Sequence, residues 1–306
     1  MKLAGSVCLL AFAATLVAAP AASAQKDADF ITPHISDARH IEVPWPSLKD
    51  NLTREIELPQ WAPVHVGPLT MDLSPTKHIV MMLIAFTLCV LLLVGAARSQ
   101  GRRAATGAPP KGFANAMEAT VLYMRNEIIL PNVGHRGEKF VPYCLTLFFF
   151  ILVMNLLGLL PWGASATGNI SVTATLAICS FIVVEVAGMR ALGKKYLSTI
   201  FYWPHDMALP IRIPISLIMT PIELISKFTK PLALAIRLFA NMTAGHVLVL
   251  ALISLIFTFG SIWILPAPFL AATAIMVLEL LVAFLQAFVF TLLVAVFIGQ
   301  IRESAH

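Results

Sequence analysis

Long runs of apolar residues recur along most of the chain. Each run exceeds the roughly 18 residues that a helix needs to cross a hydrocarbon core of about 30 Å. The runs extend over Ile79–Ala97, Val141–Leu160, Asn169–Gly188, Pro231–Gly260 and Ala267–Ile301. This pattern predicts an all-α polytopic membrane protein with about five spanning helices.

The last run is too long to stand upright in a bilayer. As a helix, Ala267–Ile301 would measure about 52 Å at 1.5 Å per residue, against a hydrocarbon core of about 30 Å. We therefore expect the last two helices to be long and strongly tilted. Because mismatch alone rarely drives a large tilt, we also expect a large curved partner surface beside them.

A segment between the first and second runs has a different pattern. Residues Phe113–Leu130 carry too many charges to span a membrane. Apolar residues nevertheless recur at helical steps from Met117 to Ile128, opposite Glu118 and Arg125. This periodicity predicts an amphipathic helix on the membrane surface.

Prolines and charged residues interrupt the stretch from Tyr196 to Lys230. A proline inside a helix removes a backbone hydrogen bond and clashes with the preceding turn, so we expect broken backbone here. Such backbone is tolerated at membrane depth only where protein or water surrounds it. The prolines concerned are Pro204, Pro210, Pro214 and Pro221.

The N-terminal quarter of the chain has two parts. Residues 1–24 have the pattern of a secretory signal, with Lys2, an apolar core and the small residues Ala22-Ser23-Ala24. We predict cleavage after Ala24; the alternative is an uncleaved first span. Residues 25–75 are acidic and rich in proline, and we expect an irregular extracytoplasmic extension. Residues 76–306 then form the membrane domain.

Composition excludes an ordinary soluble enzyme, and charge sets the orientation. Hydrophobic residues make up 58% of the 306 residues and charged residues only 12%, whereas soluble domains carry about 25% charged residues. The net charge of +5 arises from basic residues around the apolar runs, where it needs no nucleic-acid partner. The positive-inside rule places the loops after the first and third runs, and the C-terminus with Arg302, in the cytoplasm.

Arg237 lies inside an apolar run with no carboxylate near it in the sequence. A guanidinium at mid-membrane costs about 3 to more than 10 kcal/mol. Arginine cannot be deprotonated in proteins, so Arg237 can hold an anion or block other cations but cannot relay a proton. The alternative is an arginine that snorkels toward the interface near Lys230.

The helix face that carries Arg237 is lined by small side chains. At about 100° per residue, four neighbours fall within about 60° of Arg237. They are Ala233, Ala240, Asn241 and Ala244. Small residues allow another helix to approach closely, and we expect that helix to bring a carboxylate.

Two titratable residues lie in the last two runs. His246 is about 180° around the helix from Arg237. Glu279 shares a face of the next helix with Gln286. If the two helices run antiparallel, His246 and Glu279 can approach at similar depth, and because histidine titrates near neutrality such a pair can pass protons. The alternative is a buried ion pair that only holds two helices together.

Two further carboxylates are candidates for ion pairs or for the aqueous path. Glu223, about four turns before Arg237, either lines the same aqueous path or pairs with Lys227 at the i,i+4 spacing. Glu185 lies five residues before Arg190 and is predicted to form an ion pair at the interface.

Three motifs resemble the a subunit of the F-type ATP synthase membrane sector. They are LALAIRLFANMTAGH around Arg237, LQAFVFTLL about 40 residues later, and MNLLGLLPWG from Met154. The similarity covers roughly Leu69 to the C-terminus. It implies a non-catalytic stator channel in the bacterial plasma membrane. The implied partners are a rotating ring of c subunits, each with one membrane-embedded carboxylate, and peripheral-stalk b subunits.

The resemblance also implies roles for individual residues. Arg237 matches the arginine that meets the ring carboxylate and prevents protons from leaking between two offset half-channels. Asn241 and Gln286 match polar positions beside it, and Glu223 matches an acidic position of the access path. Many bacterial relatives carry Glu and His where this chain has His246 and Glu279. We expect protons to enter from the exported side past Glu223, His246, Glu279 and Gln286.

Other classes of function make different predictions. The chain has no GxxxxGK[ST] loop, so we expect no nucleotide binding by this chain, and we expect no cofactor. A self-contained secondary transporter or channel is the main alternative, although no internal repeat is visible. A passive membrane anchor is the third, and it predicts that His246 and Glu279 are dispensable.

Overall fold

The structure is a computed structural model. It describes residues 37, 39–44, 53–61, 64–66, 69–72, 74–105, 112–134, 137–160, 165–201, 209–259 and 266–303. Five helices in this part of the chain are long and apolar enough to cross a membrane, which confirms the all-α polytopic fold. The predicted signal peptide, residues 1–24, lies outside the described residues.

Short strands form before the first long helix. β1 (His40–Pro44) pairs antiparallel with β2 (Thr53–Glu57), and β3 (Val64–Val66) with β4 (Leu69–Met71). In the first pair, Ile41 lies opposite Ile56 along the backbone. The expectation of an irregular extension is wrong for these residues. Strands of three to five residues contain too few alternations of apolar and polar residues to be recognised in a segment rich in proline.

Asp37 fastens this extension to the membrane domain. Its Oδ1 atom lies 2.7 Å from Nδ1 of His78, in the first turn of α4 (Lys77–Ala105). Its Oδ2 atom accepts a hydrogen bond of 3.1 Å from Nδ2 of Asn169, which caps α8 (Ile170–Leu192). One carboxylate therefore joins the first turns of two long helices.

A second contact of the extension centres on Asp72. Its carboxylate accepts hydrogen bonds from Nη2 of Arg39 at 2.6 Å and from the backbone N–H of Ser74 at 3.0 Å. Hydrogen bonding from Ser74, first through its side chain and then through its backbone, holds the pKa of Asp72 below its usual range, and Arg39 adds to the effect. The backbone N–H of Trp61 donates to Oγ of Ser74 at 3.0 Å.

The amphipathic segment is helical, as predicted. Its apolar face packs against the core, and Glu118 is exposed. Its end lies against the last turn of the chain's final helix, because Nη1 of Arg302 donates to the Val133 carbonyl at 2.8 Å. The segment comprises α5 (Gly112–Tyr123), the π-helical turn η2 (Met124–Ile129) and α6 (Leu130–Val133).

The centre of the core is α7 (Val141–Gly158). Phe148 and Ile151 are fully buried in it, because α7 is apolar all round and has protein on several sides. It forms a hairpin with α8, and the short turn η4 (Ala166–Gly168) lies between them.

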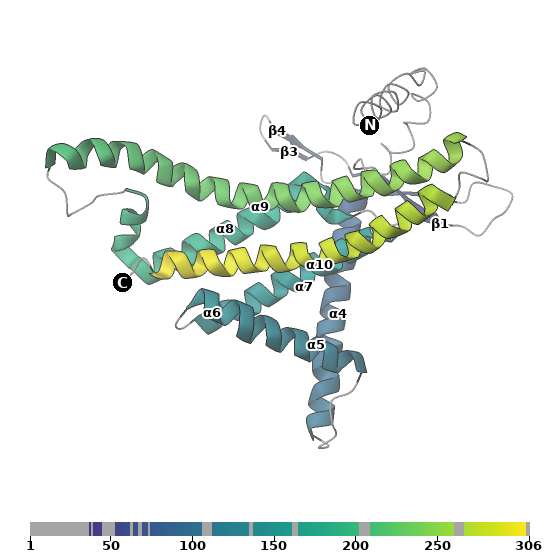
Figure 1. The fold of residues 1–306 in the computed structure, drawn as a ribbon, viewed down its shortest axis with the longest axis horizontal. Helices are drawn as coiled ribbons and strands as arrows, with labels where there is room; N and C mark the ends of the chain where they lie inside the picture. Colours follow the sequence, from purple (N-terminus) through teal and green to yellow (C-terminus); the bar gives the residue numbers. More distant parts are fainter. Residues whose placement is uncertain are drawn as a thin grey trace, which may run out of the picture.

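The last two helices, α9 (Leu209–Phe259) and α10 (Pro266–Glu303), run antiparallel side by side (Figure 1). The expected break is wrong from Leu209 onward, because α9 continues through Pro214, Pro221 and Pro231. Pro204 lies outside the described residues. Proline has a φ angle that suits a helix and forfeits one backbone hydrogen bond. Such losses bend a long helix without ending it.

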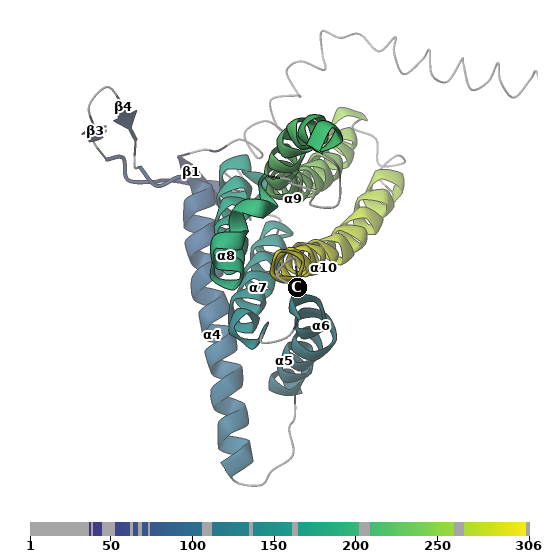
Figure 2. The ribbon, with the colours of Figure 1, turned by 90° about the vertical axis from the view of Figure 1, so that its left-hand side faces the viewer.

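The helices have two main directions. In Figures 1 and 2, α4 stands across the direction of α9 and α10, and α7 and α8 pack between them. If α4 is upright in a bilayer, α9 and α10 are strongly tilted. This agrees with the length of α9, 51 residues, which is about 76 Å of helix.

Candidate functional site

Arg237 lies on the uncovered face of α9. Its four small or polar neighbours on that face, residues 233, 240, 241 and 244, are exposed with it. The other face packs inward through Leu234 and Leu238, which are 4% and 0% exposed. In the described part of the chain, the guanidinium has no carboxylate within 4.0 Å. The counter-charge that a cation at membrane depth requires is therefore not supplied by these residues.

Asn241 joins Arg237's face of α9 to α10. Its Nδ2 atom donates to Oε1 of Gln286 at 2.9 Å. Gln286 is only 5% exposed, so its amide needs such a partner. The hydrogen bond brings together the two polar residues that the sequence assigned to the neighbourhood of Arg237.

Glu279 lies against the residue next to His246. A methyl group built on Gly245 would be 2.7 Å from Cδ of Glu279 and would overlap Oε1. The structure thus places Glu279 of α10 at the level of His246 on α9, against the preceding residue Gly245. Neither Nε2 of His246 nor Oε1 of Glu279 has a hydrogen-bond partner among the described residues, although both atoms are buried.

Thr243 adds a third polar atom to this region. Its Oγ1 is buried and also has no partner in the described part of the chain. Buried polar atoms in proteins are usually satisfied by protein or by ordered water. Each of these atoms, on Thr243, His246 and Glu279, is therefore a point at which ordered water could bind.

A buried polar chain, which the sequence analysis did not identify, lies beside α10. Nδ2 of Asn155 donates to the Ala283 carbonyl at 3.1 Å, and Oδ1 of Asn155 accepts from Oγ1 of Thr167 at 2.8 Å. Thr167 in turn lies 2.7 Å from Oγ of Ser165. Asn155 is 0% exposed. An asparagine inside the apolar MNLLGLLPWG motif was the signal that could have revealed it.

Glu223 lies far from His246. The two residues are 23 positions apart on the continuous helix α9, or about 34 Å. Glu223 instead lines a cavity of about 240 Å³ between α8, α9 and α10, whose other polar members include Glu185, Lys227 and Gln300. The structure therefore does not bring Glu223 to the proton path that the sequence predicted for it.

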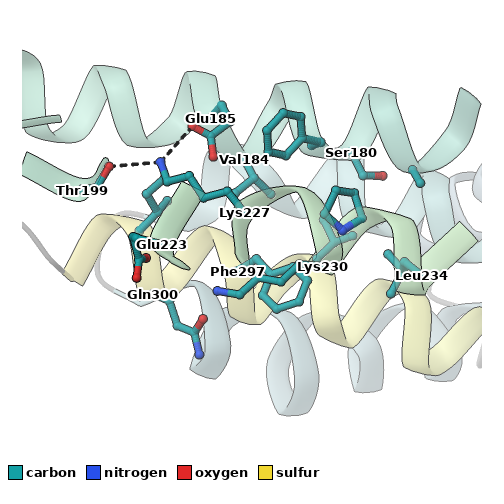
Figure 3. Close-up of a pocket in the computed structure, with 15 residues that line it drawn as sticks. Ser180, Val184, Glu185, Thr199, Glu223, Lys227, Lys230, Leu234, Phe297 and Gln300 are labelled. Carbon is teal, nitrogen blue, oxygen red and sulfur yellow. Dashed lines mark hydrogen bonds and ion pairs between the residues drawn. The ribbon is translucent and has the colours of Figure 1, made fainter. Parts of the chain in front are cut away.

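The ion pairs at this cavity also differ from those expected. Nζ of Lys227 lies 3.3 Å from Oε2 of Glu185 and 3.1 Å from Oγ1 of Thr199 (Figure 3). Glu185 thus pairs with Lys227 of α9 and not with Arg190 of its own helix. The long side chain of Lys227 reaches Glu185 from a neighbouring helix. Residue spacing along one helix cannot reveal such a pair.

Comparison with known proteins identifies the family of the chain. Residues 79–299 match the profile of the family described as ATP synthase A chain. ATP synthase subunit a of Chloroherpeton thalassium is 46% identical over 230 residues, which cover 75% of this chain and 67% of that protein. ATP synthase subunit a 2 of Chlorobaculum tepidum is 47% identical over 256 residues, 82% of this chain and 68% of that protein.

A third relative extends the comparison to another bacterial group. ATP synthase subunit a of Myxococcus xanthus is 44% identical over 247 residues, which cover 77% of this chain and 75% of that protein. The match to the family profile runs from the first turn of α4 to near the end of α10. The multi-pass helical protein described above therefore belongs to the ATP synthase A chain family.

Proposed function

We propose that this chain is the proton-translocating stator subunit of an F-type ATP synthase. The observation that carries the proposal is the exposed position of Arg237 on a face of small residues, without a carboxylate partner in the described part of the chain. A ring of c subunits that presents one carboxylate at a time would supply the missing charge. Because arginine keeps its charge, it would attract that carboxylate and prevent protons from passing straight through.

Two separate polar regions on either side of Arg237 support two offset half-channels. The first contains Thr243, His246 and Glu279, with their unpartnered buried atoms. The second is the cavity that Glu223 lines. Along α9, Arg237 is about 14 Å from His246 and about 21 Å from Glu223.

The orientation of the chain assigns each half-channel to one side. Basic residues follow α4 and α8 and end α10, so we place these ends in the cytoplasm and the mature N-terminus outside. Glu223 lies near the cytoplasmic end of α9 and His246 nearer the exported end. We therefore revise the hypothesis that all four residues lie on one path: protons enter past His246 and Glu279, and leave past Glu223.

In this proposal the chain conducts protons and makes no ATP itself. A proton neutralises a ring carboxylate, the neutral site turns through lipid, and the proton is released to the cytoplasm. Each elementary charge that crosses supplies about 2.3 kcal/mol per 100 mV, so several are needed for each ATP made elsewhere in the complex. Peripheral-stalk b subunits would hold this chain against the torque in the bacterial plasma membrane.

Substitution of Arg237 in the assembled complex tests the proposal. Inverted membrane vesicles with Arg237→Ala are expected to lose proton-driven ATP synthesis down to background, because the ring carboxylate has no cation to meet. Arg125→Ala, on the amphipathic segment, is the matched control and should synthesise ATP normally. Normal synthesis by Arg237→Ala would overturn the proposal.

Cross-linking tests the partner directly. A cysteine at Asn241, on the exposed face of α9, should cross-link to a small hairpin subunit that carries a membrane carboxylate. If the purified chain alone transported protons or another solute, the alternative of a self-contained transporter would be correct.

A further inference from the structure

Glu223 has two lysines within reach along its own helix. Lys227 follows it by four residues and Lys230 by seven. A glutamate four residues before a lysine is the favourable orientation for a helical ion pair. Local sequence therefore favours a Glu223–Lys227 pair, which would keep the Glu223 carboxylate charged.

In the tertiary structure, Lys227 contacts other side chains instead of Glu223. Its Nζ atom contacts Oε2 of Glu185 at 3.3 Å, Oγ1 of Thr199 at 3.1 Å and the hydroxyl of Tyr196 at 3.5 Å. The Tyr196 hydroxyl also donates to Oε2 of Glu185. The side chains of Lys227 and Glu185 are only 12% and 13% exposed. Figure 3 shows the ammonium directed to Glu185 and Thr199.

Lys230 also contacts a group other than Glu223. Nζ of Lys230 lies 5.2 Å from the centre of the Phe297 ring of α10, within the range of a cation–π interaction. As a result Glu223 has no ammonium or guanidinium within 4.0 Å among the described residues.

Residues of α8, α9, α10 and one short turn surround Glu223 in the cavity. α8 contributes Glu185, and α9 contributes Lys227 and Lys230. From the turn η5 (Gly193–Thr199) come Tyr196 and Thr199, both bonded to Lys227. α10 contributes the uncharged Phe297 and Gln300 to the cavity wall. Among the described residues that line this cavity, the positive charges beside Glu223 are therefore the two lysines that other groups hold.

We propose that Glu185, Tyr196 and Thr199 form a lysine clamp, which holds Lys227 so that Glu223 stays unpaired and free to exchange protons with the cytoplasm. The proposal rests on the function proposed above for Glu223. It makes Glu185 and Tyr196 positioning residues that act through Lys227. An ammonium beside a carboxylate favours its charged form, so release of Lys227 toward Glu223 would suppress proton uptake by that carboxylate.

Glu185→Gln tests the clamp. Inverted vesicles stripped of the ATP-making sector conduct protons passively, and their medium is the cytoplasmic side. Glu185→Gln frees Lys227, and we expect proton conduction to fall several-fold and its half-maximum to move to lower medium pH. The double variant Glu185→Gln/Lys227→Gln removes the freed ammonium, and conduction and pH profile should return toward the wild type. Glu118→Gln, on the exposed face of α5, is the matched control.

Several outcomes would overturn the clamp. Wild-type conduction by Glu185→Gln would contradict it, because release of Lys227 would then have no effect on Glu223. A double variant that stays as impaired as the single one would contradict it too, because Glu185 would then be a relay or a purely structural anchor. Should Glu185→Gln fail to assemble, Tyr196→Phe/Thr199→Ala weakens the same clamp and is expected to shift the pH profile in the same direction; an unshifted profile would equally overturn it. Glu223→Gln separates the two proposals, because normal conduction by that variant contradicts the role of Glu223 itself.

Discussion

Gly245 provides the space in which the Glu279 carboxylate lies. A methyl group at residue 245 would overlap Oε1 of Glu279 and lie 3.0 Å from its Cγ. The acid of α10 can therefore reach the level of His246 only because its neighbour on α9 has no side chain. The close packing of α9 and α10 at Gly245 therefore fixes the position of the Glu279 carboxylate.

Gly245→Ala should displace Glu279 and impair proton flow. A helical alanine is itself favourable compared with glycine, so the expected loss comes from displacement of the carboxylate and not from a weaker helix. We expect ATP-driven proton pumping to fall by about an order of magnitude with the complex still assembled. Gly95→Ala, where no atom lies within 4 Å of the new methyl group, should pump normally.

Exchange of the acid and the imidazole tests whether they act together. His246→Glu and Glu279→His alone leave two acids or two imidazoles at similar depth, and we expect each to lower proton-driven ATP synthesis strongly. The double exchange restores one group of each kind and should recover much of the activity. If the double variant were no better than the single ones, the two residues would act independently. Synthesis rates in inverted vesicles provide the measurement.

Asn155→Ala should destabilise the bundle. The substitution leaves the buried hydroxyl of Thr167 without its acceptor, and an unsatisfied buried polar group costs about 1–3 kcal/mol. We expect earlier thermal aggregation of the purified complex and less chain in the membrane. Asn126→Ala, an exposed position on η2, is the control of the same type and should change neither quantity.

The contact between Asp72 and Ser74 should weaken only in acid. The pKa of Asp72 is lowered in the folded chain from an ordinary value of 3.8, so its contribution is complete above that value and is lost as the pH falls through the folded pKa. Hydrogen-exchange protection of the Ser74 amide, corrected for intrinsic rates, should be constant near neutrality and fall below about pH 4. Asp72→Asn should show low protection without this pH dependence.

Several features follow from the sequence because they depend on local composition. Apolar runs such as Val141–Leu160 must become helices in a bilayer, since no other open structure satisfies its backbone hydrogen bonds there. The exposed face of Arg237 was predictable for a similar reason, because helical periodicity alone places Ala240 and Ala244 beside it. The contact of Glu279 with Gly245 also agrees with the antiparallel arrangement that the sequence analysis considered for the last two helices.

Other features were not evident from the sequence. The sequence around Pro214 and Pro221 predicts a broken helix, yet α9 is continuous, because the φ angle of proline suits a helix and each proline forfeits only one backbone hydrogen bond. Lys227 similarly had a suitable partner in Glu223 on its own helix but contacts Glu185 of α8.

The sequence by itself thus determined that the chain crosses a membrane, which face carries the lone arginine, and which family the motifs resemble. Only the tertiary structure decided which polar side chains meet: Lys227 contacts Glu185 and Asp37 contacts His78, whereas Glu223 has no cation within 4.0 Å among the described residues. The physical reason is that an ion pair depends on the positions of two side chains in space. Residue spacing specifies those positions within one helix but not between helices that pack together.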